Sequence, residues 1–400
     1  MNRRLVFALL TMAIAQAAVY IARPMTSYRL LGLGSGARDV GLVTAAFALL
    51  PLFLAIPLGR LSDRRGGAPL LVVGCALQGV ACVLLSVADT APELAAASVV
   101  LGVGHLGLAL GVQDVIARES GDDRHDQHFG WMTAGVALGQ LVGPLAGGLL
   151  LGDRSGRALT GATGRAMLVA AGILAAATAC AVVAERSRAA RPTGATSART
   201  GSIRTIASTR GVPAGIFASI AVLSSADVFT AYMPVIGEQR GIGPRAIGVL
   251  LAVRAAASMG SRIGIGTLVR RLGRLRLISL SAAAAAAALA GVAVTGNVLV
   301  LCLLSAAAGV GLGFGQPLSM TIVVQAVPEY ARSTALAVRL TGNRLGQVAT
   351  PAAAGVVAGS AGVSSVFWML SGLLVASGVA IRRGAPAPLR PADPVETIVE

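Results

Sequence analysis

Long apolar segments recur along the whole of this 400-residue chain, and short polar or Arg-rich segments separate them. Most of them have the length of about 20 residues that an α-helix needs to cross the hydrocarbon core of a bilayer. The pattern predicts an all-α membrane protein with twelve spans, at residues 5–22, 39–58, 69–88, 94–117, 129–151, 165–184, 213–236, 245–268, 276–295, 298–325, 334–358 and 363–381.

The composition favours a membrane protein over a soluble one. Hydrophobic residues make up 55% of the chain and charged residues only 12%, whereas soluble domains carry about 25% charged residues. A net charge of +16 would suit a nucleic-acid-binding protein. Because the arginines gather between the apolar segments, membrane topology accounts for them better, and no nucleic-acid partner is expected. The four cysteines lie inside apolar segments without a CxxC spacing, so neither a disulfide framework nor a metal site is expected.

The distribution of arginine predicts the orientation of the chain in its membrane. With both termini in the cytoplasm, 22 arginines lie inside, eight lie outside and three lie within spans, and the chain has no lysine. Cytoplasmic loops carry the excess of basic residues in membrane proteins. We therefore expect a multi-pass protein of the plasma membrane with both termini cytoplasmic. The first apolar segment resembles a signal peptide, but its length favours a retained first helix.

A repeat at a constant offset of 207 residues divides the chain into two halves. Four regions of the first half recur in the second without a gap; Gly41 returns as Gly248, and Leu138-Gly139-Gln140 returns as Leu345-Gly346-Gln347. The repeat predicts two pseudo-symmetric six-helix bundles, with a substrate site near the membrane midplane between them. The expected organisation is a first half at 1–184, a polar cytoplasmic linker at 185–212, a second half at 213–384 and a disordered tail at 385–400.

The fifth apolar segment is free of charge and carries glycines at a regular spacing. From Gly135 to Gly147 a glycine recurs every fourth residue, which leaves one face of the helix nearly bare and lets another helix approach closely. A proline in the same segment removes one backbone donor and predicts a kink. The spacing resembles the antiporter motif of exporters in the major facilitator superfamily, at Gly130, Gly139, Gly143, Pro144, Gly147 and Gly148. An ordinary glycine-rich packing helix is the alternative.

The loop between the second and third segments resembles a second signature of the same superfamily, at Gly59, Asp63, Arg64 and Gly66. The glycines suit a tight turn. The resemblance implies that Asp63 contacts the start of the eleventh helix, in the other half, and so latches one conformational state. A carboxylate at a helix N-terminus contributes roughly 0.3–1 kcal/mol, which suits a reversible latch. Position 67 is Gly where the family often has Arg, and an ordinary Arg-rich cytoplasmic loop is the alternative.

Opposite charges stand in two consecutive segments of the second half. Asp227 and Arg254 each lie nine residues from the predicted outer end of their spans, which places both roughly 13 Å deep at 1.5 Å per residue. We expect an ion pair between them. Ionisable groups inside a membrane default to functional hypotheses, so Asp227 is our first candidate for a proton-carrying group that alternates between Arg254 and a proton. A purely structural pair is the alternative.

The fourth segment departs from the pattern of proton-coupled exporters. The resemblance implies an arginine in this helix, and Ser98 stands in its place. His105 and Asp114 are further candidates for proton coupling, because imidazole titrates near neutral pH and a carboxylate can carry a proton. The alternatives are a packing role for His105 and a solvated or Arg-paired role for Asp114 at the cytoplasmic end.

Polar residues within the spans are the candidates for lining a substrate cavity: Gln16, Tyr20, Gln140, Arg339, Asn343, Arg344 and Gln347. An arginine that faced lipid at the depth of Arg344 would be untenable, so it is expected to face a cavity or a partner. Arg254, Arg339 and Arg344 against Asp227 leave a central charge of about +2, which favours a substrate with an anionic or zwitterionic group. The alternative is that Arg339 is cytoplasmic and Arg344 is paired.

The combined reading is a secondary transporter that works by alternating access and exports a small organic molecule, such as a drug or metabolite, in exchange for protons. Export follows from the resemblance alone. No cofactor is expected, since a chain without lysine cannot form the GxxxxGK[ST] nucleotide loop, and the proton gradient would supply the energy. A monomer is expected. An importer or facilitator of a metabolite and a non-transporting membrane receptor or scaffold are the alternatives; no catalytic constellation indicates an enzyme.

Overall fold

The computed structural model of the chain describes residues 3–120, 124–186, 208–328 and 331–384. Within these ranges the chain forms thirteen α-helices and no strand. The expected linker and tail fall largely on residues 187–207 and 385–400, which lie outside the described residues.

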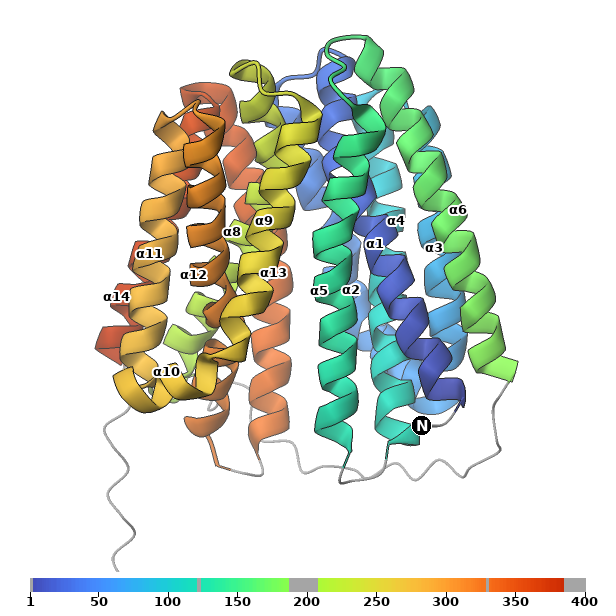
Figure 1. Ribbon diagram of the computed structural model, residues 1–400. Coiled ribbons are helices and arrows are strands. Elements are labelled where there is room, and N and C mark those ends of the chain that lie inside the picture. The colour runs from blue at the N-terminus through green and yellow to red at the C-terminus, as the bar shows by residue number, and fades with distance from the viewer. Residues whose placement is uncertain (1–2, 121–123, 187–207, 329–330, 385–400) are drawn as a thin grey trace, which may run out of the picture.

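Two bundles of helices stand side by side, one from each half of the chain (Figure 1). The first bundle contains α1 (Arg3–Gly32), α2 (Ala37–Arg65), α3 (Ala68–Val87), α4 (Ala91–Glu119), α5 (His125–Leu151) and α6 (Ala158–Arg186). The second contains α8 (Val212–Gln239), α9 (Pro244–Ile263), α10 (Ile265–Leu272), α11 (Arg274–Val294), α12 (Val298–Gln325), α13 (Arg332–Ala361) and α14 (Val363–Gly384). Apart from the short α10, these are the twelve long helices that the sequence predicts.

Eleven of the described helices are long and apolar enough to cross a membrane on their own composition. The twelfth long helix, α13, has 30 residues but carries Arg339 and Arg344 in its interior. Arg339 is buried, and the guanidinium of Arg344 donates to Gln347, which in turn donates to Asp227 of α8. These polar side chains of α13 thus lie on its side that faces the middle of the molecule.

Several helix boundaries differ from the predicted ones. The second helix continues to Arg65, so Gly59 and Arg64 lie on α2 and not in the predicted loop, and α6 begins at Ala158, before the predicted residue 165.

The first apolar run ends near Ala22, but α1 continues to Gly32, so Arg23 and Arg29 lie within a helix and not in the outer loop. In the second half α9 ends at Ile263, and residues after Gly264 form the separate helix α10. Gly264 itself has φ −91° and ψ 2°, outside the helical region. The strongly amphipathic Arg-rich sequence of α10 suits a surface helix better than the last turns of a membrane span.

The buried Arg29 of α1 and the half-buried Arg240, directly after α8, bind helix carbonyls where α1 and α8 extend beyond their apolar runs. Arg29 donates from Nε to the carbonyl of Ala88 at 2.6 Å and from Nη1 to that of Thr160 at 3.1 Å. In the second half, Arg240 donates to the carbonyls of Val292 and Ala293. The acceptors at Ala88, Val292 and Ala293 belong to the C-terminal ends of α3 and α11, where helix carbonyls lack intrahelical partners. The two arginines therefore donate hydrogen bonds to carbonyl groups that have no partner within their own helices.

We call the end where α1 passes into α2 the outer end, following the predicted orientation. There the two halves meet through glycines: a Cβ added at Gly41 would lie 2.5 Å from the Cα of Gly355, and one added at Gly248 would lie 3.1 Å from the Cα of Gly148. Gly41 and Gly248 are equivalent in the repeat, and so are Gly148 and Gly355. The hydroxyl of Tyr232 also donates to the carbonyl of Ala37 at 3.0 Å. The outer end is thus closed by pseudo-symmetric contacts of backbone on backbone.

We expect Gly41→Ala to open the outer end, because the new methyl group would meet the backbone of α13 at 2.5 Å and backbone, unlike a flexible side chain, cannot move aside locally. The measurement is labelling of a cysteine introduced at Ser27 by a membrane-impermeant maleimide, with the four native cysteines as background. The expected result is several-fold faster labelling.

Gly36→Ala is the matched control, since nothing lies within 4 Å of a Cβ at Gly36. Equal labelling rates in the Gly41→Ala variant and the parent would show that the contact does not hold the outer end closed.

Candidate functional site

A buried carboxylate stands at the centre of the molecule. Asp227, in the middle of α8, is only 7% exposed. Its Oδ1 accepts a hydrogen bond from Arg23 Nη1 of α1 at 2.7 Å, and its Oδ2 accepts one from Gln347 Nε2 of α13 at 2.7 Å. Arg344 in turn donates to Gln347 Oε1 at 3.1 Å. The network therefore joins three helices, and the Arg23–Asp227 ion pair crosses from one half to the other.

The predicted ion pair between Asp227 and Arg254 is wrong. Arg254 forms no ion pair within the described residues, and its guanidinium lies 5.7 Å from the ring of Phe229. Phe229 is two residues beyond Asp227 and so points to a different side of α8. Arg23 supplies the counter-charge, although hydropathy places it in the outer loop just after the first apolar run. Hydropathy holds no signal for this placement, because the apolar run ends before Arg23 and only the structure shows that α1 continues to Gly32.

Asp227 also lies between two cavities. The outer cavity is lined by residues of α1, α2, α4 and α8, and the central cavity by residues of α1, α5, α8, α9 and α12. Among the described residues, Asp227 is the only acidic one that lines either cavity, and it lines both, as does Thr230. A change of charge on this carboxylate therefore changes the electrostatic potential in both cavities.

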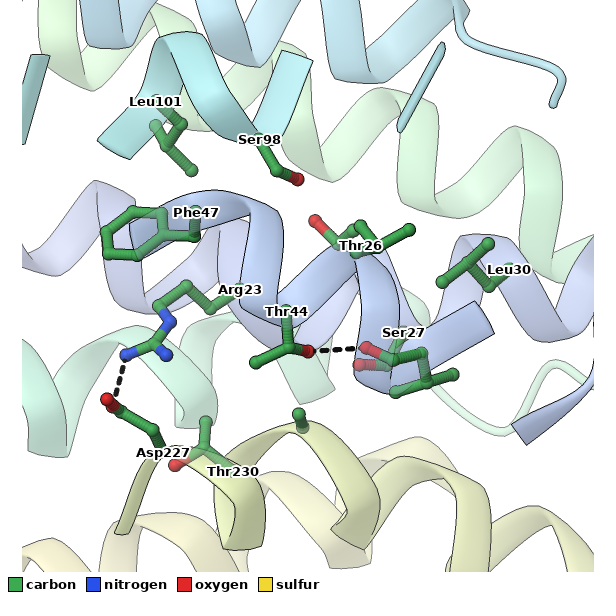
Figure 2. Close-up of a pocket in the computed structure, with 13 residues that line it drawn as sticks. Arg23, Thr26, Ser27, Leu30, Thr44, Phe47, Ser98, Leu101, Asp227 and Thr230 are labelled. Carbon is green, nitrogen blue, oxygen red and sulfur yellow. Dashed lines mark hydrogen bonds and ion pairs between the residues drawn. The ribbon is translucent and has the colours of Figure 1, made fainter. Parts of the chain in front are cut away.

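The outer cavity is polar on several sides. Figure 2 shows the Arg23 guanidinium directed at Asp227 and lying beside the ring of Phe47, with 5.0 Å between guanidinium carbon and ring centroid. Hydroxyl groups surround the rest of the space, from Thr26, Ser27, Thr44, Ser98 and Thr230. Ser98 is thus part of this site, although it is not the arginine that the family resemblance implies at its position.

The repeat places equivalent hydrogen bonds in the two halves. Gln140 Nε2 of α5 donates to the hydroxyl of Tyr20 on α1 at 2.8 Å, just as Gln347 of α13 donates to Asp227 on α8. Gln140 and Gln347 are equivalent at the offset of 207 residues, and so are Tyr20 and Asp227. The same scaffold therefore holds a neutral phenol in the first half and a carboxylate in the second. Tyr20 and Gln140 both line the central cavity.

Arg339 is held by α12. Its Nη2 donates to Gln316 Oε1 at 2.7 Å, to the Gln316 carbonyl at 3.1 Å and to Ser319 Oγ at 3.3 Å. Gln316 lines the central cavity, so Arg339 lies behind its wall. Asn343, one turn further along α13, is buried with its Oδ1 unpartnered among the described residues.

The remaining candidates in the first half form no hydrogen bond with Arg23, Asp227 or Gln347 within the described residues. Gln16 is buried and donates to the sulfur of Met12 at 3.7 Å. The ring of His105 packs 5.6 Å from that of Phe47, and its Nδ1 is buried without a partner in the described part of the chain. Asp114 accepts hydrogen bonds from the backbone amide of Gly67 at 2.6 Å and from Arg118 Nε at 2.8 Å. These contacts match the alternative of an Arg-paired residue at the inner end.

The glycines of the fifth-helix motif serve close packing against α1. A Cβ added at Gly139 would lie 2.6 Å from Gln16 Cβ, one at Gly143 would lie 2.6 Å from Tyr20 Cβ, and one at Gly147 would lie 3.0 Å from Met25. Gly148 and Pro144 instead meet α9 in the other half, whereas Gly130 borders open space. The motif thus positions α1, which carries both Tyr20 and Arg23.

The predicted latch is described only in part. Gly66 ends α2 with φ 81°, a conformation that favours glycine. Arg64 is exposed and Gly59 borders open space. The side chain of Asp63 lies outside the described residues, so its contact with the start of α13 stays a prediction.

Comparisons with known proteins converge on one family. The profile of the Major Facilitator Superfamily matches residues 5–299 and 216–398. The chain is 33% identical over 117 residues to the class C tetracycline resistance protein of Escherichia coli, covering 28% of each chain. It is 29% identical over 127 residues to the quinolone resistance protein NorA of Staphylococcus aureus, covering 32% of this chain and 33% of the relative. The chain therefore spans about a third of the length of these curated relatives.

Solved structures share the fold over nearly the whole chain. A transporter of the POT family in complex with 5-aminolevulinic acid superposes with a TM-score of 0.78 at 13% identity, covering 96% of each chain. The nucleoside transporter NupG gives 0.74 at 12% identity, covering 96% of this chain and 99% of its own. The D-xylose–proton symporter gives 0.73 at 14% identity, covering 96% and 97%. At these identities the likeness concerns the fold alone.

We expect Arg23→Gln to destabilise the protein, by about 3–5 kcal/mol, because breaking a buried ion pair leaves one charge uncompensated. Thermal unfolding of the purified protein in detergent is the measurement. Adding Asp227→Asn to Arg23→Gln is expected to restore part of the loss, since it removes the stranded charge.

Arg165→Gln is the control, because Arg165 is an exposed arginine on α6. If the double variant were as unstable as the sum of the two single variants, the ion pair would not be the source of the effect.

Proposed function

Because the chain belongs to the major facilitator superfamily, we propose that it is a secondary transporter that exports a small organic molecule in exchange for protons. Alternating access between its two halves would carry the substrate through the central cavity. Asp227 would carry the proton.

The observation that supports the proposal most directly is the ion pair of Asp227 with Arg23. The two groups belong to different halves and are 2.7 Å apart, and their side chains are 10% and 13% exposed. A carboxylate in this place can act as a switch, because a proton removes the charge on which a strong ionic hydrogen bond depends. Protonation of Asp227 would thus weaken the link between the halves, and loss of the proton would restore it.

The network around Asp227 supplies the parts for such a switch. Deprotonated Asp227 accepts from Arg23 and from Gln347, and this is the arrangement seen when the outer end is closed. A protonated Asp227 would keep a neutral hydrogen bond with Gln347 while Arg23 is released. Release would favour the state in which the halves separate at the outer end, so that a proton taken up outside would reset the transporter. Substrate would then be loaded from the inner end in the deprotonated state.

Export is supported by the two relatives that are named for resistance to tetracycline and to quinolones, although they match only about a third of this chain. The fifth-helix motif points the same way, and its glycines hold α1 against α5. An importer or facilitator is the second candidate, since the fold is shared with a D-xylose–proton symporter. A receptor or scaffold fits less well, because the central cavity is lined by polar residues from five helices.

We expect Asp227→Asn to abolish proton-coupled transport while leaving the protein folded. Inverted membrane vesicles with a pH-sensitive dye, challenged with a panel of organic compounds, provide the measurement. In the parent protein a transported compound is expected to dissipate the imposed pH gradient. In Asp227→Asn vesicles the same compound is expected to have no effect, because the asparagine cannot carry a proton.

Asp114→Asn is the matched comparison, since it removes a carboxylate that is bound to Arg118 and lies outside both cavities. It is expected to retain coupling. Full coupling in Asp227→Asn would reject Asp227 as the proton carrier, and substrate flux without any proton movement in the parent would favour a facilitator.

A further inference from the structure

Two arginines of α9 differ from the other arginines at the centre of the molecule. Arg23 is paired with Asp227, Arg339 is held by Gln316 and Ser319, and Arg344 donates to Gln347. Arg254 and Arg262 form no hydrogen bond or ion pair within the described residues, and the Nε of each is buried without a partner. Arg254 is only 5% exposed.

Both residues line the central cavity together with Ser258. The three stand at intervals of four residues, so they share one face of α9 and form a row of cation, hydroxyl and cation. Arg262 is next to the inner end of the helix, at Ile263. Arg254 lies eight residues further in, about 12 Å along the helix axis at 1.5 Å per residue. The row therefore leads from the inner end of the cavity toward its middle.

The charges of this row lack a counter-charge in the cavity. Asp227 is the only acidic residue lining it in the described part of the chain, and both of its oxygens are already engaged by Arg23 and Gln347. A buried guanidinium without a partner is unfavourable, and in a membrane protein it marks a functional site by default. The row is thus a site for an anion that comes from outside the protein.

The other residues that line the central cavity indicate what kind of anion would fit there. Val222, Leu223, Ala226 and Leu312 form an apolar part of the wall, and the ring of Phe229 lies beside Arg254. The Cα atoms of Arg254 and Arg262 are separated by about 12 Å along the helix, and Ser258 lies between them on the same face. One planar guanidinium matches one carboxylate through two parallel hydrogen bonds, whereas a phosphate dianion would call for two cations together.

We propose that Arg254, Ser258 and Arg262 form an anion-binding site that takes the carboxylate of an organic acid with an apolar body. The acid meets Arg262 first at the inner end and is held at Arg254, with Ser258 between them. The preferred ligand carries no ammonium group, because the one carboxylate in the described lining already accepts from Arg23 and Gln347. The inference rests on the proposed transport function, of which it names the substrate class.

Ligand binding is tested with the purified full-length protein in nanodiscs, by thermal unfolding at constant ionic strength. The probes are benzoate, hexanoate and 2-naphthoate, each compared with its neutral amide, and phenyl phosphate. The carboxylates are expected to raise the unfolding temperature and the amides are not. Arg254→Gln is expected to weaken carboxylate binding at least tenfold, and Arg262→Gln several-fold.

Arg245→Gln is the matched control, because it removes an exposed arginine from the outer end of the same helix. It is expected to leave carboxylate binding unchanged. Equal responses to carboxylates and amides, or equal carboxylate binding in Arg254→Gln and the parent, would overturn the proposal. A response to phenyl phosphate with none to any carboxylate would overturn the assignment to carboxylates.

A second measurement needs no ligand. Arg254→Met removes a buried charge that has no hydrogen bond or ion pair within the described residues, so the ligand-free variant is expected to unfold at a higher temperature than the parent. A lower unfolding temperature would mean that Arg254 is a structural residue, and the site would be rejected. These outcomes are independent of proton coupling. Carboxylate binding without proton movement would support the anion site and reject the proposed proton antiport. Proton-coupled export of cations alone would support the antiport and reject the anion site.

Discussion

A charge buried in the interior of a membrane protein must find a partner there, and the structure depends on how this requirement is met at Asp227. Its partner, Arg23, comes from the other half of the chain. The buried Asp227 carboxylate is therefore paired with a positive charge only when the two halves are together. Such a contact is strong enough to bias the arrangement of the halves and, unlike apolar packing, it can be removed by a single proton. The proposed proton-coupled transport by alternating access would use a link with both properties.

The outer end is closed by a different kind of contact. Gly41 meets Gly355 and Gly148 meets Gly248, in two crossings that the repeat relates to each other. Bare backbone surfaces fit closely without forming bonds that are difficult to break, and small residues at helix interfaces permit this approach in membranes. In the proposed mechanism the glycine contacts provide a closely fitting surface at the outer end, and the ion pair would provide the sensitivity to protons.

The two halves share a scaffold but not a charge distribution. Gln140 binds Tyr20 where Gln347 binds Asp227, so one hydrogen bond of the fold is kept and one ionisable group is added. Arg254 stands where the first half has Phe47, and the ring of Phe47 lies against Arg23. The two arginines without a counter-charge among the described residues, Arg254 and Arg262, thus belong to the second half. In the proposed mechanism the organic acid would lie mainly against α9, and the proton would be carried on α8. Substrate and proton would act on neighbouring parts of one electrostatic system.

The sequence by itself determined the twelve long helices, the two pseudo-symmetric bundles and the family, because apolar length, the repeat and glycine spacing are properties of local segments. It also placed Asp227, Arg254, Tyr20 and Gln140 at the centre, since their depth follows from their position along a helix. The partners were decided by tertiary structure. Arg23 follows the apolar run and would be a loop residue on hydropathy, yet α1 continues because buried contacts further along satisfy Arg29. Which arginine meets Asp227, and which two are left without a counter-charge, depends on how helices distant in the chain rotate and pack, and no local pattern records that.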